Sequence, residues 1–259
     1  MLITSKDNAA VKALKKLLST PKRSDERIVL EGIHVCQAFL AQGGRPFKVW
    51  VAESSQMNLE IAELLMTLQT ERVAVNRLPD AIFRELSILE QGASIIFEVV
   101  RPTETAWLTE GNAILLDGVQ DPGNMGSILR SAAAAGVRHV YLNSTCVNPF
   151  SPKVLRAAVG AHFSLHIVEH VNLIELMGYL RQHGTQTIAT SSYAASNLYD
   201  LNLNQAVAWL MGNEGAGVAQ ALIEAADMRA YIPMRHGESL NVAAAAAVCL
   251  FEMQRQQRH

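Results

Sequence analysis

The sequence of 259 residues contains only three cysteines, Cys36, Cys146 and Cys249, and they lie far apart along the chain. No C-x-x-C pair is present, and no cluster of histidine and cysteine has the spacing of metal ligands, so the sequence predicts neither a metal site nor a disulfide framework. We expect the three cysteines to be small buried side chains in a protein of a reducing compartment.

The sequence also lacks a long apolar run. Its longest apolar stretch, 242–251, is too short and too rich in alanine to span a bilayer. Polar and charged residues interrupt 1–16, where a signal peptide needs a continuous apolar segment. Because 49% of the residues are hydrophobic and 18% are charged, we expect an ordinary globular protein of the cytoplasm, with no membrane partner.

A strong net charge is absent as well, since the formal total is only -2. The distribution of charge is more informative than the total. Residues 1–30 carry seven basic and three acidic side chains, a local net charge of +4. This basic segment indicates either an anionic partner or simply the solvated face of a helix, and charge alone leaves both interpretations open.

Short apolar segments alternate with segments of helical periodicity, which predicts an α/β protein. We expect strands at 27–31, 47–52, 72–75, 94–100, 113–116, 139–142, 164–168, 187–190, 206–211 and 229–232. We expect helices at 7–18, 34–41, 59–68, 125–135, 153–159, 173–182, 218–225 and 240–255. The later strands alternate little between apolar and polar residues, which favours a parallel sheet covered on both faces. Periodicity is lost over 101–112, so we predict one domain over 1–103 and a second over 112–259.

Three segments of the second domain share one arrangement, in which a strand ends in a polar, glycine-containing loop that opens onto a helix. Ligands of open α/β sheets bind at such ends of strands. In the first segment, 116–130, Pro122 stiffens the loop and Asn124 is expected to cap the helix. Arg130 lies in that helix among small residues, where it is either a partner in a surface ion pair or a functional cation.

The second segment, 209–217, has its glycines in the order G-x-x-G-x-G, which differs from the dinucleotide-binding order G-x-G-x-x-G. Glu214 within this loop argues against a phosphate-binding role. In the third segment, 231–241, Ser239 is expected to cap the last helix. Asn241 would then lie in the first turn, where its low helix propensity suggests another role.

Taken together, the three segments resemble the signature motifs of the SpoU/TrmH family of RNA ribose methyltransferases. The matching pieces are 121–126 with Arg130, then 211–215, then 232–234 with 239–241. The resemblance covers residues from about 112 to the end, and less specifically the first domain, which resembles a ribosomal-protein-like RNA substrate-binding domain. It implies a trefoil knot in the second domain, a threading that general folding rules would have excluded.

The resemblance also implies S-adenosyl-L-methionine as the cofactor, held mainly by backbone groups. The positions that match cofactor contacts are Met211, Gly212, Asn213, Ile232, Met234 and Leu240. The positions that match functional side chains are Asn124, Arg130, Glu214, Ser239 and Asn241. The basic residues expected to contact RNA phosphates are Lys12, Lys15, Lys16 and Arg23. The loop 235–238 departs from the family pattern, since it is about one residue shorter than in many relatives.

The implied reaction is methylation of a ribose 2′-hydroxyl in RNA, with ribosomal RNA favoured over transfer RNA. Family accounts give Arg130 the role of activating the hydroxyl, whereas the permanent protonation of arginine favours a charge-stabilising role. The small residues 243–247 of the last helix favour a homodimer through the second domain. The alternatives are methylation of transfer RNA and a catalytically idle RNA-binding protein of the same fold, while the order of the glycines excludes a nicotinamide-dependent oxidoreductase.

Overall fold

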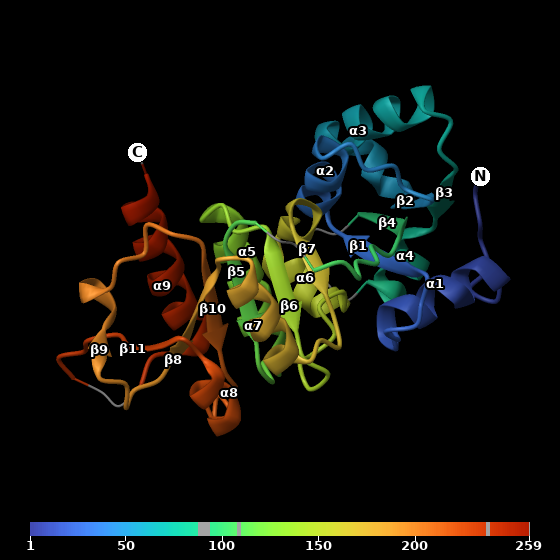
Figure 1. The fold of residues 1–259 in the computed structure, drawn as a ribbon. Helices are drawn as coiled ribbons and strands as arrows, with labels where there is room; N and C mark the ends of the chain where they lie inside the picture. The colour runs from blue at the N-terminus through green and yellow to red at the C-terminus, as the bar shows by residue number, and fades with distance from the viewer. Residues whose placement is uncertain (88–93, 108–109, 237–238, 259) are drawn as a thin grey trace. The chain divides into compact units, whose positions relative to one another are not determined.

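The computed structural model describes residues 1–87, 94–107, 110–236 and 239–258 (Figure 1). The chain forms two compact units. The first contains Met1–Pro102 together with Phe150–Phe163, and the second contains Thr103–Pro149 and Ser164–His259. The expectation that 112–259 forms one uninterrupted domain is therefore wrong for 150–163. The physical reason is tertiary, because helix α6 (Pro152–Ala158) packs on a strand of the first unit and buries its apolar residues there.

The first unit is built on a four-stranded sheet in the order β1-β4-β2-β3. Its strands are β1 (Arg27–Glu31), β2 (Lys48–Ala52), β3 (Val75–Leu78) and β4 (Ile95–Val100). Strand β4 runs antiparallel to both of its neighbours, whereas β2 and β3 are parallel. The strand expected at 72–75 thus begins only at Val75, because Arg72 has a left-handed backbone (φ 57°) that turns the chain after the preceding helix.

Helices cover the first unit's sheet. Helices α1 (Ala9–Ser19) and α4 (Asp80–Leu86) share one apolar cluster with the sheet, to which Val11 and Trp50 belong. Helix α2 (Ile33–Ala41) packs on β1 and β4 and contacts α3 (Leu59–Thr70). The sequence did not predict α4, whose seven residues are too few to establish a helical period. The short 3₁₀ turns are η1 (Glu53–Met57), η2 (Ala161–Ser164) and η3 (Leu198–Asp200).

The second unit contains a seven-stranded sheet in the order β7-β6-β5-β10-β8-β11-β9, and every adjacent pair is parallel. Its strands are β5 (Ala113–Leu116), β6 (His139–Leu142), β7 (His166–Val168), β8 (Gln186–Thr190), β9 (Ser196–Asn197), β10 (Val207–Met211) and β11 (Met228–Tyr231). The apolar strands predicted a parallel α/β sheet, and the structure confirms it. Only the two-residue β9 was not expected.

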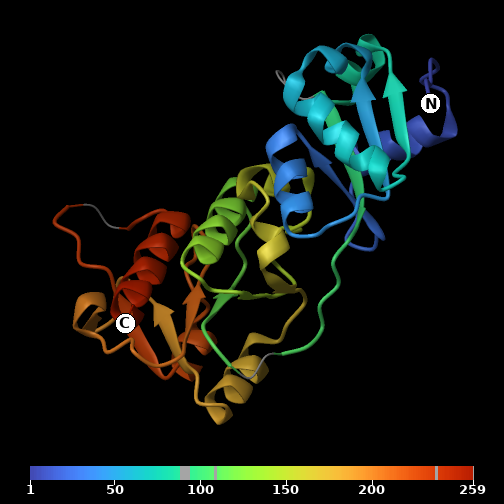
Figure 2. The ribbon, with the colours of Figure 1, turned by 90° about the horizontal axis from the view of Figure 1, so that it is seen from above.

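Helices cover both faces of this sheet (Figure 2). Helices α7 (Leu173–Gln182) and α8 (Gln220–Ala225) contribute to an apolar cluster with alternate residues of the strands. Helices α5 (Pro122–Ala134) and α9 (Val242–Gln257) pack against each other, and α9 also contacts β10. Residues facing both layers are buried in the central strands β5 and β10, which explains why these two strands are apolar throughout.

The three cysteines are free and buried, as expected. Among the helices of the described residues, none combines the length and apolar character that a membrane span requires.

Candidate active site

The three motif segments all leave the second unit's sheet at the edge formed by the carboxyl ends of its parallel strands. Strands β5, β10 and β11 each run into one of these loops, and parallel strands place their carboxyl ends together. Strand β10 pairs directly with β5, and Asp117, the first loop residue after β5, donates its backbone N–H to the Met211 carbonyl at 2.9 Å. Residues that are far apart in the sequence therefore meet at this edge.

Three polar side chains, one from each segment, form a continuous cluster. The Asn124 amide nitrogen donates to Glu214 Oε1 at 3.0 Å, across 90 positions of sequence. The Asn241 amide nitrogen donates to Asn124 Oδ1 at 2.9 Å, across 117 positions. We call Asn124, Glu214 and Asn241 the motif cluster; Asn124 is its centre because it both donates and accepts.

Glu214 is held as a carboxylate. It also accepts hydrogen bonds from the backbone N–H groups of Gln120 at 3.4 Å and Asp121 at 3.2 Å. Burial alone would raise the pKa of the Glu214 carboxyl, but the hydrogen bonds from Asn124 and from the backbone outweigh burial and lower the pKa below its ordinary value of 4.5. Glu214 is therefore ionised at neutral pH and serves as an anchor for the first loop.

The helix caps differ from the sequence-based expectation. Asp121, and not Asn124, caps α5 by accepting a hydrogen bond from the Asn124 N–H at 2.8 Å. Pro122, with its fixed φ, occupies the first position of the helix. Asn241, and not Ser239, caps α9, accepting from the backbone of Ala243 at 2.9 Å. The side chain of Asn124 is thus released from capping and available to the motif cluster.

The second loop is shaped by Gly212 and Asn213. A Cβ atom on Gly212 would lie 2.1 Å from the Gly217 carbonyl carbon and from the Val218 nitrogen, so only glycine fits there. The Asn213 side chain donates to the Gly118 carbonyl at 2.8 Å and accepts from the backbone N–H of Gly215 at 2.9 Å. Asn213 therefore folds its own loop and joins it to the first one.

The sequence analysis missed two positioning residues, Asp117 and Asn143. The Asn143 side chain donates to Asp117 Oδ1 at 2.6 Å and accepts from the Gly118 N–H at 3.1 Å. The other carboxylate oxygen of Asp117 accepts from the Ala219 N–H at 2.8 Å, at the start of α8. Both residues directly follow a strand, β5 or β6, and this position at the carboxyl end of the sheet is the signal that could have identified them.

Arg130 stays outside the motif cluster. Its side chain is exposed and has no hydrogen bond or ion pair with the residues that the structure describes. Toward the start of α5, the positions on its face of the helix are Gly126, Ser127 and Gly123. Long helical side chains extend toward the helix N-terminus, so these small residues leave Arg130 room to reach toward the site.

The remaining cofactor candidates lie at the same edge of the sheet, and among the described residues none of them forms a hydrogen bond with the motif cluster. Met211 is buried in β10, and Ile232 is half-buried after β11. Met234 and Leu240 are 38% and 40% exposed. Ser239 is exposed. The last two residues of the short loop 235–238 lie outside the described residues.

The lysines expected to contact RNA belong to the first unit. Helix α1 buries Val11, Leu14 and Leu18 and exposes the lysines on its other face. Lys12 forms an ion pair with Asp7 at 2.9 Å. Lys15 and Lys16 are exposed, and Arg23 is half-buried after the helix. In the described ranges of both units, no group of three or more potential side-chain ligands is placed to hold a metal ion.

Residues 111–251 match the model of the SpoU rRNA Methylase family. The 23S rRNA (guanosine(2553)-2′-O)-methyltransferase of Bacillus subtilis is 29% identical over 97% of this chain and 98% of its own length. A crystal structure of an RNA 2′-O ribose methyltransferase superposes with a TM-score of 0.83, at 30% identity and 99% coverage of both chains. The AdoMet-bound rRNA methyltransferase of Sinorhizobium meliloti gives 0.84, at 25% identity, with 100% of this chain and 99% of that chain covered. This chain belongs to the SpoU rRNA methylase family.

Proposed function

We propose that this protein methylates a ribose 2′-hydroxyl in RNA with S-adenosyl-L-methionine as the donor, and that its substrate is ribosomal RNA. The observation that carries the proposal is the motif cluster, which brings Asn124, Glu214 and Asn241 together at the ligand-binding edge of the sheet. The Bacillus subtilis relative is named for the 2′-O-methylation of 23S rRNA, and the Sinorhizobium meliloti relative binds AdoMet.

The residues of the three loops fit this cofactor. Exposed Met234 and Leu240, with half-buried Ile232, provide an apolar surface for adenine and the thioether chain, while the backbone of 211–213 offers polar groups. The bound cofactor supplies a methyl group activated by a sulfonium centre. The chain supplies the shape of the site, because Gly212 and Asn213 determine the course of the second loop.

Arg130 acts on the RNA in this proposal. Displacement at a methyl carbon requires the attacking oxygen to lie in line with the carbon–sulfur bond that breaks. The hydroxyl proton must pass to an acceptor, a phosphate of the RNA or water, as the oxygen–carbon bond forms, and the oxygen carries negative charge to the extent that the proton leaves first. Arginine stays protonated, so Arg130 binds the phosphate of the target nucleotide and stabilises the developing alkoxide. Glu214, Ser239 and Asn241 orient the ribose and the loops around it.

The proposal extends to the rest of the molecule. The first unit binds RNA through the phosphate contacts of Lys12, Lys15, Lys16 and Arg23. The second unit forms a homodimer through α9, and the protein acts in the cytoplasm, where ribosomes are found. The proposal includes the trefoil knot. Strand β11 pairs with β8 and not with β10, although β10 is the strand that precedes β11 in the chain, and this crossover supports the knot.

Two measurements on the purified protein test the proposed function. Calorimetric titration with S-adenosyl-L-methionine should show saturable binding, and incubation of labelled donor with total RNA should mark ribosomal RNA at one 2′-O position. If only the transfer RNA fraction were methylated, the substrate would be transfer RNA and not ribosomal RNA. Cofactor binding without any transfer, or no binding at all, would favour the idle RNA-binding protein of the same fold.

A further inference from the structure

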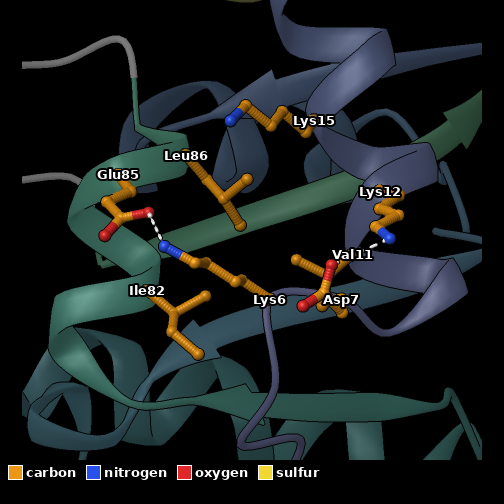
Figure 3. A pocket seen from close by; sticks show the side chains of 8 residues that line it. All are labelled: Lys6, Asp7, Val11, Lys12, Lys15, Ile82, Glu85 and Leu86. Atoms are coloured by element: carbon orange, nitrogen blue, oxygen red, sulfur yellow. Dashed lines mark ion pairs between the residues drawn. The ribbon is translucent and has the colours of Figure 1, made fainter.

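The first unit contains a cavity between α1 and α4 of about 250 Å³ (Figure 3). Val11 and Leu86, both buried, and half-buried Ile82 give it an apolar wall. Pockets for drug-sized ligands span roughly 300–1,000 Å³. The cavity is therefore slightly smaller than this range, and its volume suits one planar heterocycle.

The rim of this cavity carries charges of both signs. Lys6 pairs with Glu85 at 3.8 Å and Lys12 pairs with Asp7 at 2.9 Å, while Lys15 has no ion-pair partner among the described residues. The side chains of both pairs are more than half exposed, and such pairs contribute only about 0–1 kcal/mol each. A ligand can therefore separate them at little cost.

The ammonium and carboxylate groups beside the apolar wall restrict the chemistry of the ligand that the cavity can bind. Three ammonium groups suit phosphates, but two carboxylates in the same wall would repel a ligand that carried phosphate alone. A carboxylate accepts hydrogen bonds and donates none, so a ligand that separates Glu85 and Asp7 from their lysines must offer them N–H or O–H donors. An unstacked base of single-stranded RNA meets both demands, because it offers an apolar ring and a hydrogen-bonding edge beside a charged backbone.

We propose that this cavity binds one unstacked guanine of the RNA, with the Glu85 carboxylate accepting from its Watson–Crick edge and Lys15 contacting the adjacent phosphate. Guanine is the RNA base with two adjacent N–H donors on that edge, and a carboxylate has two oxygens to receive them. Glu85 is preferred to Asp7 because its lysine lies farther away, at 3.8 Å against 2.9 Å. The inference rests on the proposed function only in taking RNA as the ligand.

The test uses the full-length protein and three fluorescein-labelled decamers, namely oligouridine and the same oligomer with one central guanosine or one central inosine. Fluorescence anisotropy without cofactor should show guanosine binding at least about fivefold tighter than uridine, with inosine, which lacks the 2-amino donor, in between. Glu85→Gln should remove this preference and keep the affinity for oligouridine. Lys15→Glu should weaken all three alike and lower the salt dependence by about one phosphate contact.

Glu63→Gln, which changes an exposed carboxylate on α3, is the matched control and should keep the preference. Equal affinity for the three oligomers, or a preference that survives Glu85→Gln, would overturn the assignment. Thermal unfolding of each variant separates loss of binding from loss of structure. If the protein preferred guanosine but did not bind S-adenosyl-L-methionine, only the proposed methyl transfer would be refuted. If it bound S-adenosyl-L-methionine but did not prefer guanosine, only the proposed binding of guanine in the cavity would be refuted.

Discussion

Asn241 Nδ2 donates a hydrogen bond to Asn124 Oδ1 at 2.9 Å, although 117 positions separate the two residues. At the same time, the Asn241 side-chain oxygen caps α9. One side-chain amide therefore has two roles: its oxygen caps the helix and its nitrogen donates to Asn124. Asn124 in turn donates to Glu214.

The two tasks of Asn241 are separable. Asn241→Ser keeps a side-chain oxygen that caps a helix about as well as asparagine, but it loses the amide donor to Asn124. We expect a melting temperature within about 2 °C of wild type and a fall in methyl transfer of about tenfold or more. Asn172→Ser, the equivalent change at the cap of α7, is the control and should leave transfer unchanged. Equal effects of the two substitutions would contradict a specific role of Asn241.

Arg130→Lys should abolish most turnover while sparing cofactor binding. Lysine keeps the charge but loses the planar, two-pronged geometry that arginine offers to phosphate. We expect kcat to fall by about 10²–10³, as when one stabilising donor is removed from a transition state, with the Kd of S-adenosyl-L-methionine within about twofold. Arg138→Lys, an exposed arginine shortly after α5, should change neither quantity. Near-normal turnover of Arg130→Lys would remove Arg130 from the mechanism.

Gly212→Ala should disrupt cofactor binding. Its new methyl group would lie 2.1 Å from the backbone at Gly217 and Val218, so the second loop must move. We expect the Kd for S-adenosyl-L-methionine to rise by about tenfold or more, measured by calorimetry. Gly215→Ala in the same loop meets only Asn213 Oδ1, at 3.6 Å, and should bind the cofactor almost normally. If both variants bound equally well, the second loop would not form the cofactor site.

The Glu214 carboxylate should make stability depend on pH at the acidic end. Because its pKa is lowered in the folded state, ionised Glu214 contributes stability that is complete above the ordinary pKa of 4.5 and is lost as pH falls through the folded pKa. Urea unfolding should therefore show Glu214→Gln less stable than wild type at neutral pH, with the difference shrinking below about pH 4.

Asn124→Ala supplies the matched comparison, because it removes the side-chain hydrogen bond that contributes most to lowering this pKa. In that background the pH-dependent part of the Glu214→Gln effect should become smaller. A difference between wild type and Glu214→Gln that stays constant at all pH values would show that Glu214 titrates alike in the folded and unfolded chains.

Local patterns predicted most of the second unit's regular structure. The strands at 113–116 and 139–142 have the bounds that the apolar runs predicted, and the helix expected at 173–182 is found there. Elements with weak patterns were missed, as with α4 and β9. The helix starts were misplaced by a few residues, because aspartate, asparagine and serine all cap helices and the sequence offers several near each start.

The sequence by itself determined the α/β class, the three motif segments and the family resemblance, and it predicted the residues proposed for the site. Only the tertiary structure decided that β10 lies between β5 and β8, that Asn124, Glu214 and Asn241 bind one another, and that 150–163 packs with the first unit. The reason is physical. Apolar periodicity and turn chemistry act over a few residues, whereas strand order and contacts across 90 or 117 positions depend on which surfaces the whole chain buries together.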